Sequence, residues 1–518
     1  MITFVTRLMQ SVKHCNIEQI EMKLIQTIIS LAIIAIAAMG CEKEPKITYI
    51  YPLDIKSSIA CSYEEQTVVI SYTTDSRYQA DIKASGSYSA SWISSIDYTT
   101  PNVIKVTVDE NGGDTRSTTI NISVAGHAPT TISFTQYSIP PIEANHTLMY
   151  LFLGTSLTRY YDTNLEDAKK AIETGILGNN NRIVFFRQKE RDKGYIGELY
   201  YDFNSNSCKE RILKDDIVLD RLLLTPTALC RHIQDMATFA PAKRYGLICA
   251  GHGQGWITRE ILERNKAATY STKDSDMWTP AADAEETRAF GEENVRLNIY
   301  ELANGISSSG IKFDYILFDA CFMSNIEAIY DMRDCANYII ASPCEIMGRG
   351  FPYERTLPHL FMNEGNNTNY LKAAESYYVY YRDEYNGTSR CGSIAVYNCT
   401  EIDALAEATA RVVATATTEY DRESLQTYEG QRTHHFYDFG QWASIVATDS
   451  EALEAFDIQL SKCVIAKYSL PTFYSAYGNY GTYEIDLTIY SGITTSAPSY
   501  AYPTEWKETN WYKSVWKQ

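Results

Sequence analysis

Two short segments each combine an apolar run with a side chain that can take part in nucleophilic chemistry. Residues 246–253 read Gly-Leu-Ile-Cys-Ala-Gly-His-Gly, so His252 follows one run and has a glycine on each side. Residues 314–321 read Asp-Tyr-Ile-Leu-Phe-Asp-Ala-Cys, so Cys321 follows the other. A histidine next to a cysteine can act as general base and stabilise the nucleophilic thiolate. The pair therefore favours covalent catalysis, with peptide-bond cleavage as the expected reaction.

Each residue alone has a plainer explanation. A cysteine after an apolar strand is more often a small buried hydrophobe, and a histidine at a strand end is commonly a satisfied polar group. The joint pattern favours chemistry. Gly251 and Gly253 also leave room for a substrate backbone beside His252, which a core histidine would not need.

The surrounding elements are expected to bring the two residues together. Apolar runs predict buried strands at 148–153, 183–186, 245–250, 313–318 and 338–341. Helices are expected between them, one capped by Asn164, one opening at Thr225-Pro226 and one over 299–306. This alternation predicts an α/β domain with a mostly parallel sheet covered by helices on both faces. Since ligands collect at the carboxyl ends of such strands, His252 and Cys321 should face one crevice.

At these residues the sequence resembles the clostripain-like cysteine peptidases, relatives of caspases, gingipains and legumain. His252-Gly253 and Asp319-Ala320-Cys321 are similar to the catalytic pair of that family. Other similar segments are 148–151, 313–323, 341–343 and 350–353, and the resemblance covers about residues 146–517. It implies a caspase-like peptidase domain over 146–400, with a C-terminal α+β extension over 401–518.

The resemblance also implies roles for individual residues. Cys321 would attack the scissile carbonyl, and His252 would protonate the leaving amine. The amides of Gly253 and Cys321 would stabilise the oxyanion. No third catalytic residue is required in this clan.

Asp319 is the candidate for substrate selection. It lies two residues before Cys321, so strand alternation places both side chains on one side. In the family that this sequence resembles, the matching Asp lies at the floor of the pocket that binds the residue before the cleaved bond. The resemblance therefore predicts cleavage after Arg and, less efficiently, after Lys. Alternatively, Asp319 only accepts backbone hydrogen bonds and shapes the loop. A pocket for acidic residues would need a basic side chain, for which Arg349 is the nearby candidate.

The sequence supports neither a cofactor nor a metal. It has no HExxH motif and no CxxC zinc pattern. Many family members have a long acidic or Gly-rich loop between the catalytic pair, whereas this chain has the short segment 266–293, rich in Ser, Thr and Ala. The segment gives no support for calcium binding or self-processing.

The N-terminal region predicts export and anchoring. An apolar run from Leu24 to Gly40 follows Lys23 and ends in small residues before Cys41. Residues 1–40 are therefore interpreted as a lipoprotein signal peptide, Cys41 as the lipidated residue, and 41–60 as a tether. The expected location is the cell envelope, on the outer membrane or cell surface.

Residues 61–138 form the next predicted unit. Alternating apolar residues separated by turn sequences predict a small all-β sandwich. Trp92-Ile93, Arg116-Ser117 and 134–136 resemble BACON-type modules, which implies glycan binding as one possibility. The other is that the module only spaces the peptidase domain from the membrane.

Composition limits the partners. The chain has 518 residues, 45% of them hydrophobic, and a formal net charge of -18. It can bury a large core, and the charge argues against nucleic acid as a partner. The resulting hypothesis is an extracytoplasmic cysteine endopeptidase acting on proteins or peptides. The alternative is a catalytically silent surface lipoprotein that binds glycan or protein.

Overall fold

The computed structural model describes residues 53–517 apart from 62, 87–89, 114, 137–142, 179, 191, 203–204, 220–224, 270–279, 281–282, 290–296 and 362–368. The predicted signal peptide, Cys41 and most of the predicted tether lie outside the described residues. The chain divides into two compact units, residues 1–139 and residues 140–518.

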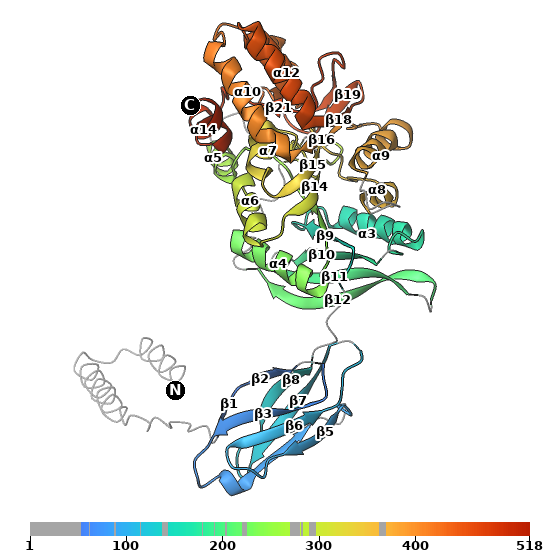
Figure 1. Ribbon diagram of the computed structural model, residues 1–518, viewed down its shortest axis with the longest axis vertical. Coiled ribbons are helices and arrows are strands. Elements are labelled where there is room, and N and C mark those ends of the chain that lie inside the picture. Colours follow the sequence, from blue (N-terminus) through green and yellow to red (C-terminus); the bar gives the residue numbers. More distant parts are fainter. Residues whose placement is uncertain are drawn as a thin grey trace, which may run out of the picture. The chain divides into compact units, whose positions relative to one another are not determined.

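The first unit is a sandwich of two four-stranded sheets, with strand orders β1-β3-β6-β5 and β2-β8-β7-β4 (Figure 1). The strands are β1 Asp54–Ile55, β2 Ser58–Cys61, β3 Gln66–Thr73, β4 Ile82–Gly86, β5 Ile93–Asp97, β6 Val103–Val108, β7 Arg116–Val124 and β8 Thr130–Gln136. Alternate residues such as Ile104, Val106 and Phe134 are completely buried between the sheets. The sandwich begins earlier than the predicted residue 61, because β2 pairs in parallel with β8. Strands β1 and β2 have two and four residues, which is too short for an alternation of apolar and polar residues to be recognised in the sequence.

The second unit is built on a nine-stranded sheet with the order β12-β11-β10-β9-β13-β14-β15-β16-β18 (Figure 1). Its strands are β9 His146–Phe152, β10 Asn181–Glu190, β11 Lys193–Asp202, β12 Ser207–Val218, β13 Tyr245–Ala250, β14 Phe313–Asp319, β15 Ala336–Ala341, β16 Ile394–Asn398 and β18 Val464–Tyr468. The five predicted strands are all present and form its centre.

Only the centre of this sheet is parallel. Strands β10, β9, β13, β14 and β15 pair in parallel. The outer strands β11, β12, β16 and β18 pair antiparallel. The large sheet is therefore mixed, whereas the sequence predicted a mostly parallel one. Glu190 of β10 pairs with Lys193 of β11, and partners so close in sequence are possible only between antiparallel neighbours.

Helices cover both faces of the large sheet, as predicted (Figure 1). Along β14, Ile316 and Phe318 enter the core beneath α4, α6, α7 and α10, while Tyr315 and Leu317 enter the core beneath α3, α8 and α9. These helices are α3 Thr158–Glu173, α4 Pro226–Phe239, α6 Ile299–Ser308, α7 Ile326–Met332, α8 Tyr353–Leu360, α9 Tyr370–Asp383 and α10 Ile402–Thr415. Helix α4 begins at Pro226 as expected, and Thr225 caps it by accepting a hydrogen bond from the Ala228 amide.

The C-terminal part shares this architecture. Strand β18 pairs with β16, so residues beyond 401 complete the large sheet. The remaining elements are α5 Arg259–Thr269, α11 Phe439–Val446, α12 Ser450–Cys463, α13 Pro503–Trp506, α14 Asn510–Val515, β17 Tyr437–Asp438, β19 Thr472–Ser475, β20 Gly481–Glu484 and β21 Thr494–Thr495.

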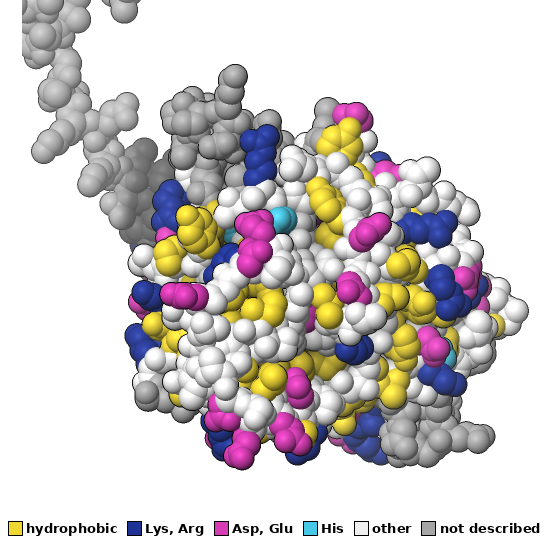
Figure 2. All heavy atoms as spheres, turned by 90° about the horizontal axis from the view of Figure 1, so that it is seen from above, with side chains coloured by type: hydrophobic (Ala, Val, Ile, Leu, Met, Phe, Trp, Pro, Cys, Tyr) yellow, Lys and Arg dark blue, Asp and Glu magenta, His cyan; other side chains and the backbone are white. Residues whose placement is uncertain are grey.

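The surface shows mixed charge. In Figure 2, Lys and Arg side chains are scattered among Asp and Glu, with no large basic patch on the face in view. Within the described residues, every helix is too short or too polar to cross a bilayer.

Candidate active site

His252 and Cys321 lie at the same edge of the large sheet. Strands β13 and β14 are adjacent and parallel, and Ala250 pairs with Asp319 at their ends. His252 and Cys321 each follow two residues after this last pair. The shared register, rather than sequence proximity, brings the two predicted catalytic residues to one place.

The residue after His252 has to be a glycine. A Cβ atom on Gly253 would lie 2.1 Å from the carbonyl oxygen and 2.7 Å from the amide nitrogen of Cys321. Any side chain would therefore push the two loops apart. The ring of His252 is itself oriented by a contact that the sequence did not reveal, since its Nε2 lies 2.9 Å from the hydroxyl of Ser156.

Cys321 is completely buried. Its Sγ accepts a hydrogen bond from the Ile346 amide at 2.9 Å. Burial raises the pKa of the Cys321 thiol well above its usual value, the nearby charge of Glu345 adds to the increase, and the Ile346 amide acts against it. The neutral thiol is therefore favoured in this structure.

The carbonyl oxygen of Arg288 occupies the predicted oxyanion site. It accepts a hydrogen bond from the Gly253 amide at 2.8 Å and one from the Cys321 amide at 3.4 Å. The two amides that the family resemblance implied as oxyanion donors therefore both donate to one peptide carbonyl of the same chain. Two such donors are the feature that stabilises a tetrahedral intermediate in acyl transfer.

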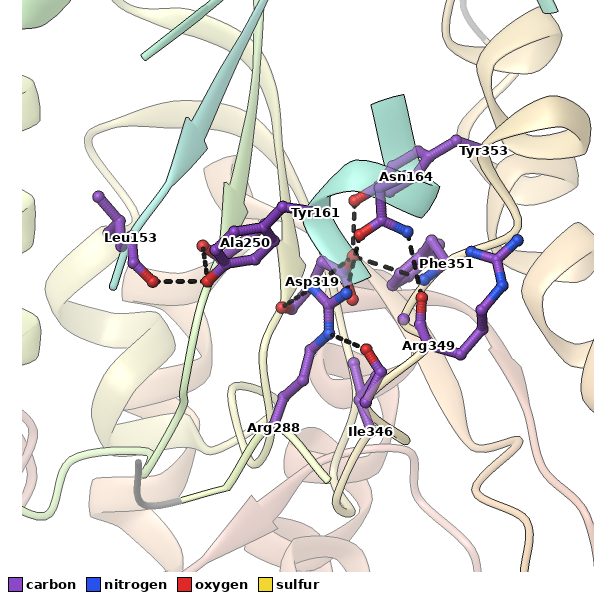
Figure 3. Close-up of polar contacts among 12 residues, drawn as sticks. Leu153, Tyr161, Asn164, Ala250, Arg288, Asp319, Ile346, Arg349, Phe351 and Tyr353 are labelled. Atoms are coloured by element: carbon purple, nitrogen blue, oxygen red, sulfur yellow. Dashed lines mark hydrogen bonds and ion pairs between the residues drawn. The ribbon is translucent and has the colours of Figure 1, made fainter. Parts of the chain in front are cut away.

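The side chain of Arg288 is completely buried, and the residues around its guanidinium, among them Asp319 and Asn164, form what we call the pocket (Figure 3). Its Nη1 lies 2.8 Å from Oδ2 of Asp319, and both side chains have no exposed surface. Nη2 donates to the Asn164 side chain at 2.8 Å, and Nε donates to the Gly348 carbonyl at 3.1 Å. Every nitrogen of the guanidinium thus has an acceptor.

One wall of the pocket depends on Gly350. Its φ is +69°, and a Cβ there would lie 2.4 Å from Nη2 of Arg288 and 2.6 Å from Oδ1 of Asp319. Asn164 forms another wall. It does not cap a helix, as the sequence suggested, but lies inside α3, which starts at Thr158. Apolar spacing located the helix correctly from Leu165 onward but missed its polar first turns.

Asp319 makes contacts of both kinds that the sequence analysis considered, an ion pair with a basic side chain and a hydrogen bond from a backbone amide. It faces Arg288, and its Oδ2 also accepts hydrogen bonds from the Tyr353 hydroxyl at 2.7 Å and from the Phe351 amide at 3.4 Å. Burial raises the pKa of Asp319, and the guanidinium of Arg288 acts against that shift. Arg349, the candidate for an acid-selective pocket, instead pairs with Asp167.

The segment before Arg288 pairs with residues 346–348 through one antiparallel bridge. The Arg288 amide donates to the Ile346 carbonyl at 2.8 Å, and the Gly348 amide donates to the Glu286 carbonyl at 2.7 Å. Thr287 pairs antiparallel with Met347 between these two bonds. Extended peptides commonly bind enzymes and adaptor domains by such strand addition.

Arg288 is the residue of the candidate site that the sequence interpretation missed. It belongs to segment 266–293, whose composition gave no reason to expect a residue in the active site. The sequence did contain one signal. Since Asp319 predicts a pocket that binds Arg, an arginine located between His252 and Cys321 in the chain was a candidate to occupy that pocket. Among the described residues, no cluster of His, Cys, Asp or Glu could hold a metal ion.

Comparison with known proteins shows the family of the second unit. Residues 226–441 match the model of the clostripain family. The chain carries a peptidase domain of the clostripain family. It is a cysteine peptidase, and the predicted caspase-like fold is confirmed. A search of curated proteins finds no match.

Solved structures of clostripain-type proteases resemble the second unit. A secreted C11 cysteine protease from Bacteroides thetaiotaomicron, iotapain, is 28% identical with a TM-score of 0.62, over 72% of this chain and 100% of that one. An inactive zymogen C11 protease from Parabacteroides distasonis is 28% identical with a TM-score of 0.59, over 73% of this chain and 99% of that one. A secreted C11 protease from B. thetaiotaomicron in complex with an irreversible peptide inhibitor has the same fold, at 24% identity and a TM-score of 0.59, over 72% of this chain and 99% of that one.

Proposed function

We propose that this clostripain-family peptidase is an extracytoplasmic endopeptidase that cleaves after Arg with a Cys321/His252 dyad, and that its own Arg288–Ala289 bond is its first substrate. One observation carries the proposal: the Arg288 carbonyl accepts hydrogen bonds from Gly253 and Cys321 while its guanidinium pairs with Asp319. Arg288 thus lies as the residue before a cleaved bond, named P1, would lie.

The chemistry follows from this placement. His252 takes the proton of the Cys321 thiol, and the thiolate attacks the Arg288 carbonyl carbon. The oxygen of the tetrahedral intermediate remains on the two amides. The C–N bond then breaks, and His252 returns the proton to the amine of Ala289. Water hydrolyses the resulting thioester, which releases the Arg288 carboxylate and restores the thiol.

The pocket favours Arg over Lys at P1. A guanidinium is planar and offers donors in several fixed directions, whereas an ammonium is a point charge on a flexible chain. Asp319, Asn164 and the Gly348 carbonyl lie around the guanidinium in three directions. A lysine would keep the attraction to Asp319 and leave other buried acceptors without donors, so Lys peptides should be cleaved more slowly.

The uncleaved chain is expected to be its own inhibitor. Arg288 fills the P1 pocket and the oxyanion site, so a second peptide cannot enter until segment 286–289 is cut and leaves. The raised pKa of the Cys321 thiol is consistent with a resting precursor. The proposed role of segment 266–293 as an inhibitory, self-cleaved segment differs from the sequence analysis, which found no support for self-processing.

Fluorogenic peptides that differ only at P1 test the proposal. Arg should be preferred over Lys, and both over Asp and Asn. Cys321→Ala and His252→Ala should abolish turnover while the folded state, followed by circular dichroism, is unchanged. Preference for an acidic P1 residue, or turnover by the Cys321→Ala variant, would refute the assignment.

Location and further partners stay proposals. A relative described as secreted supports an extracytoplasmic location. Lipidation of Cys41 and glycan binding by the sandwich rest on the sequence alone. Calcium and other cofactors have no role in the proposed chemistry.

A further inference from the structure

A buried carboxylate lies against the residue before Arg288. Glu345 has no exposed surface, and its Oε2 accepts a hydrogen bond from the Thr287 hydroxyl at 2.5 Å. Its Oε1 accepts from the Ser475 hydroxyl at 2.5 Å, and the Ala476 amide lies 3.2 Å from both oxygens. Thr287 is itself nearly completely buried, at 3% exposure.

The donors to Glu345 come from two different sources. Ser475 and Ala476 belong to the scaffold and hold one side of the carboxylate. Thr287 belongs to the segment that occupies the active site. When this segment leaves, the Ala476 amide at 3.2 Å is the one donor that Oε2 retains among the described residues. A buried acceptor that lacks a donor is costly, so an incoming substrate that supplies a hydroxyl at this position gains stability.

We infer that Glu345 selects Ser or Thr at the position immediately before the P1 arginine, named P2. The inference rests on the proposed function, because it takes segment 286–288 as a guide to how substrates bind. The preferred substrate class is therefore a peptide with a small hydroxyl residue followed by Arg. An acidic P2 residue is disfavoured, because it would bring a second carboxyl group against a buried one.

We expect weaker selection for the substrate residues that precede P2. Glu286 pairs with Arg159, but the Arg159 side chain is 70% exposed and the Glu286 side chain 35% exposed. Glu285 accepts from the Thr388 hydroxyl at 2.7 Å and is only half-buried. Exposed ion pairs contribute little to binding, whereas a completely buried hydrogen bond discriminates strongly. Selection should therefore be concentrated at P2.

Peptides that differ only at P2 test this inference, with the full-length protein after self-cleavage as the enzyme. The set keeps Arg at P1 and places Thr, Ser, Val or Asp at P2. Thr and Val have nearly the same shape, so their ratio isolates the hydroxyl. We expect kcat/KM for Thr to exceed that for Val by about tenfold, with Ser near Thr and Asp lowest. Equal rates for Thr and Val, with Arg peptides still cleaved, would overturn the inference and leave the proposed function intact. If no Arg peptide is cleaved, the proposed function fails as well.

A variant that replaces the Glu345 carboxyl group with an amide identifies the residue responsible. Glu345→Gln keeps the side-chain shape and presents an amide to P2, so the Asp peptide should gain at least tenfold relative to the Thr peptide. Glu327→Gln is the matched control, because Glu327 is also completely buried but contacts Ser496 and Trp506 instead of segment 286–289. An unchanged Asp-to-Thr ratio in folded Glu345→Gln would exclude Glu345 as the selecting residue. If that variant does not fold, the P2 series on the wild-type protein decides the inference.

Discussion

The guanidinium of Arg288 and the carboxylate of Asp319 form an ion pair at 2.8 Å in which neither side chain has exposed surface. The two residues are 31 positions apart along the chain. A buried ion pair seldom stabilises a fold in proportion to its cost in desolvation. Its place beside the Cys321 and Gly253 amides supports the proposal that the pair holds the Arg288 peptide bond for cleavage.

Self-cleavage is the first expected consequence. Purified wild-type protein should convert into two fragments, and N-terminal sequencing of the C-terminal fragment should begin at Ala289. Cys321→Ala should remain intact because it lacks the nucleophile. Arg288→Ala should also resist cleavage, because it lacks the side chain that the pocket binds. Cleavage at another bond in the Arg288→Ala variant at the wild-type rate would contradict the role of Arg288.

Asp319→Asn should lower kcat/KM for Arg peptides at least tenfold. The substitution keeps the shape of the pocket and removes the charge, and truncating one partner of a buried charge pair costs about 2 to 5 kcal/mol. Asp167→Asn is a suitable comparison, since Asp167 pairs with Arg349 at the edge of the site and should have a smaller effect. If Asp319→Asn cleaves Arg peptides as fast as the wild-type protein does, Asp319 is not part of the pocket that binds the P1 residue.

Gly350→Ala should close the P1 pocket. The added Cβ would lie 2.4 Å from the position of the guanidinium, so Arg peptides should lose at least about a hundredfold in kcat/KM. Gly310→Ala provides the control, because Gly310 has a φ of +77° but nothing within 4 Å of its added Cβ. Both variants introduce comparable backbone strain of about 1 to 2 kcal/mol. Similar melting temperatures with very different activities would separate blocking of the pocket from strain.

The stability of the protein should depend on Glu345 between weakly acidic and neutral pH. Burial raises the pKa of Glu345 from 4.5 to about 7. The folded state therefore binds more protons than the unfolded state in this range, and the free energy of unfolding decreases as pH rises from about 4.5 to about 7.

Glu345→Gln removes this group, so its unfolding free energy should decrease less over the same interval. Urea unfolding of both proteins at about pH 5 and about pH 8 measures the difference, in a Cys321→Ala background that keeps the chain intact. Parallel pH profiles would show that the Glu345 carboxyl titrates normally.

Cys41 should determine membrane association. Several acyl chains hold a lipoprotein firmly, whereas one chain alone anchors only marginally. Wild-type protein expressed in a bacterial host should sediment with membranes, and Cys41→Ala should appear in the soluble fraction. An N-terminus upstream of Cys41 in the mature protein, found by mass spectrometry, would refute the signal-peptide prediction.

The sequence predicted the centre of the fold well, because long apolar strands have a strong local signal. Strands β9, β10, β13, β14 and β15 all coincide with apolar runs. The antiparallel strands β16 and β18 were not predicted. Val464–Tyr468 alternates between half-buried and exposed residues at the edge of the sheet, so its pairing depends on tertiary context.

The candidate site was predicted only in part for a similar reason. His252, Gly253, Asp319 and Cys321 lie at strand ends, where register fixes their position. Asn164, Gly350 and Glu345 belong to elements whose local sequence carries no signal for a pocket. Their roles arise from contacts with Arg288 and Thr287, which only the folded chain reveals.

Arg288 is attached to the enzyme that binds it, and this attachment determines how activation responds to concentration. A tethered segment acts at an effective concentration in the millimolar range, far above that of a free peptide. Self-cleavage should therefore be a first-order process whose half-time does not change on dilution. Free Arg peptides should compete poorly until the bond is cut. The enzyme can then become active as a single molecule, without meeting a second copy.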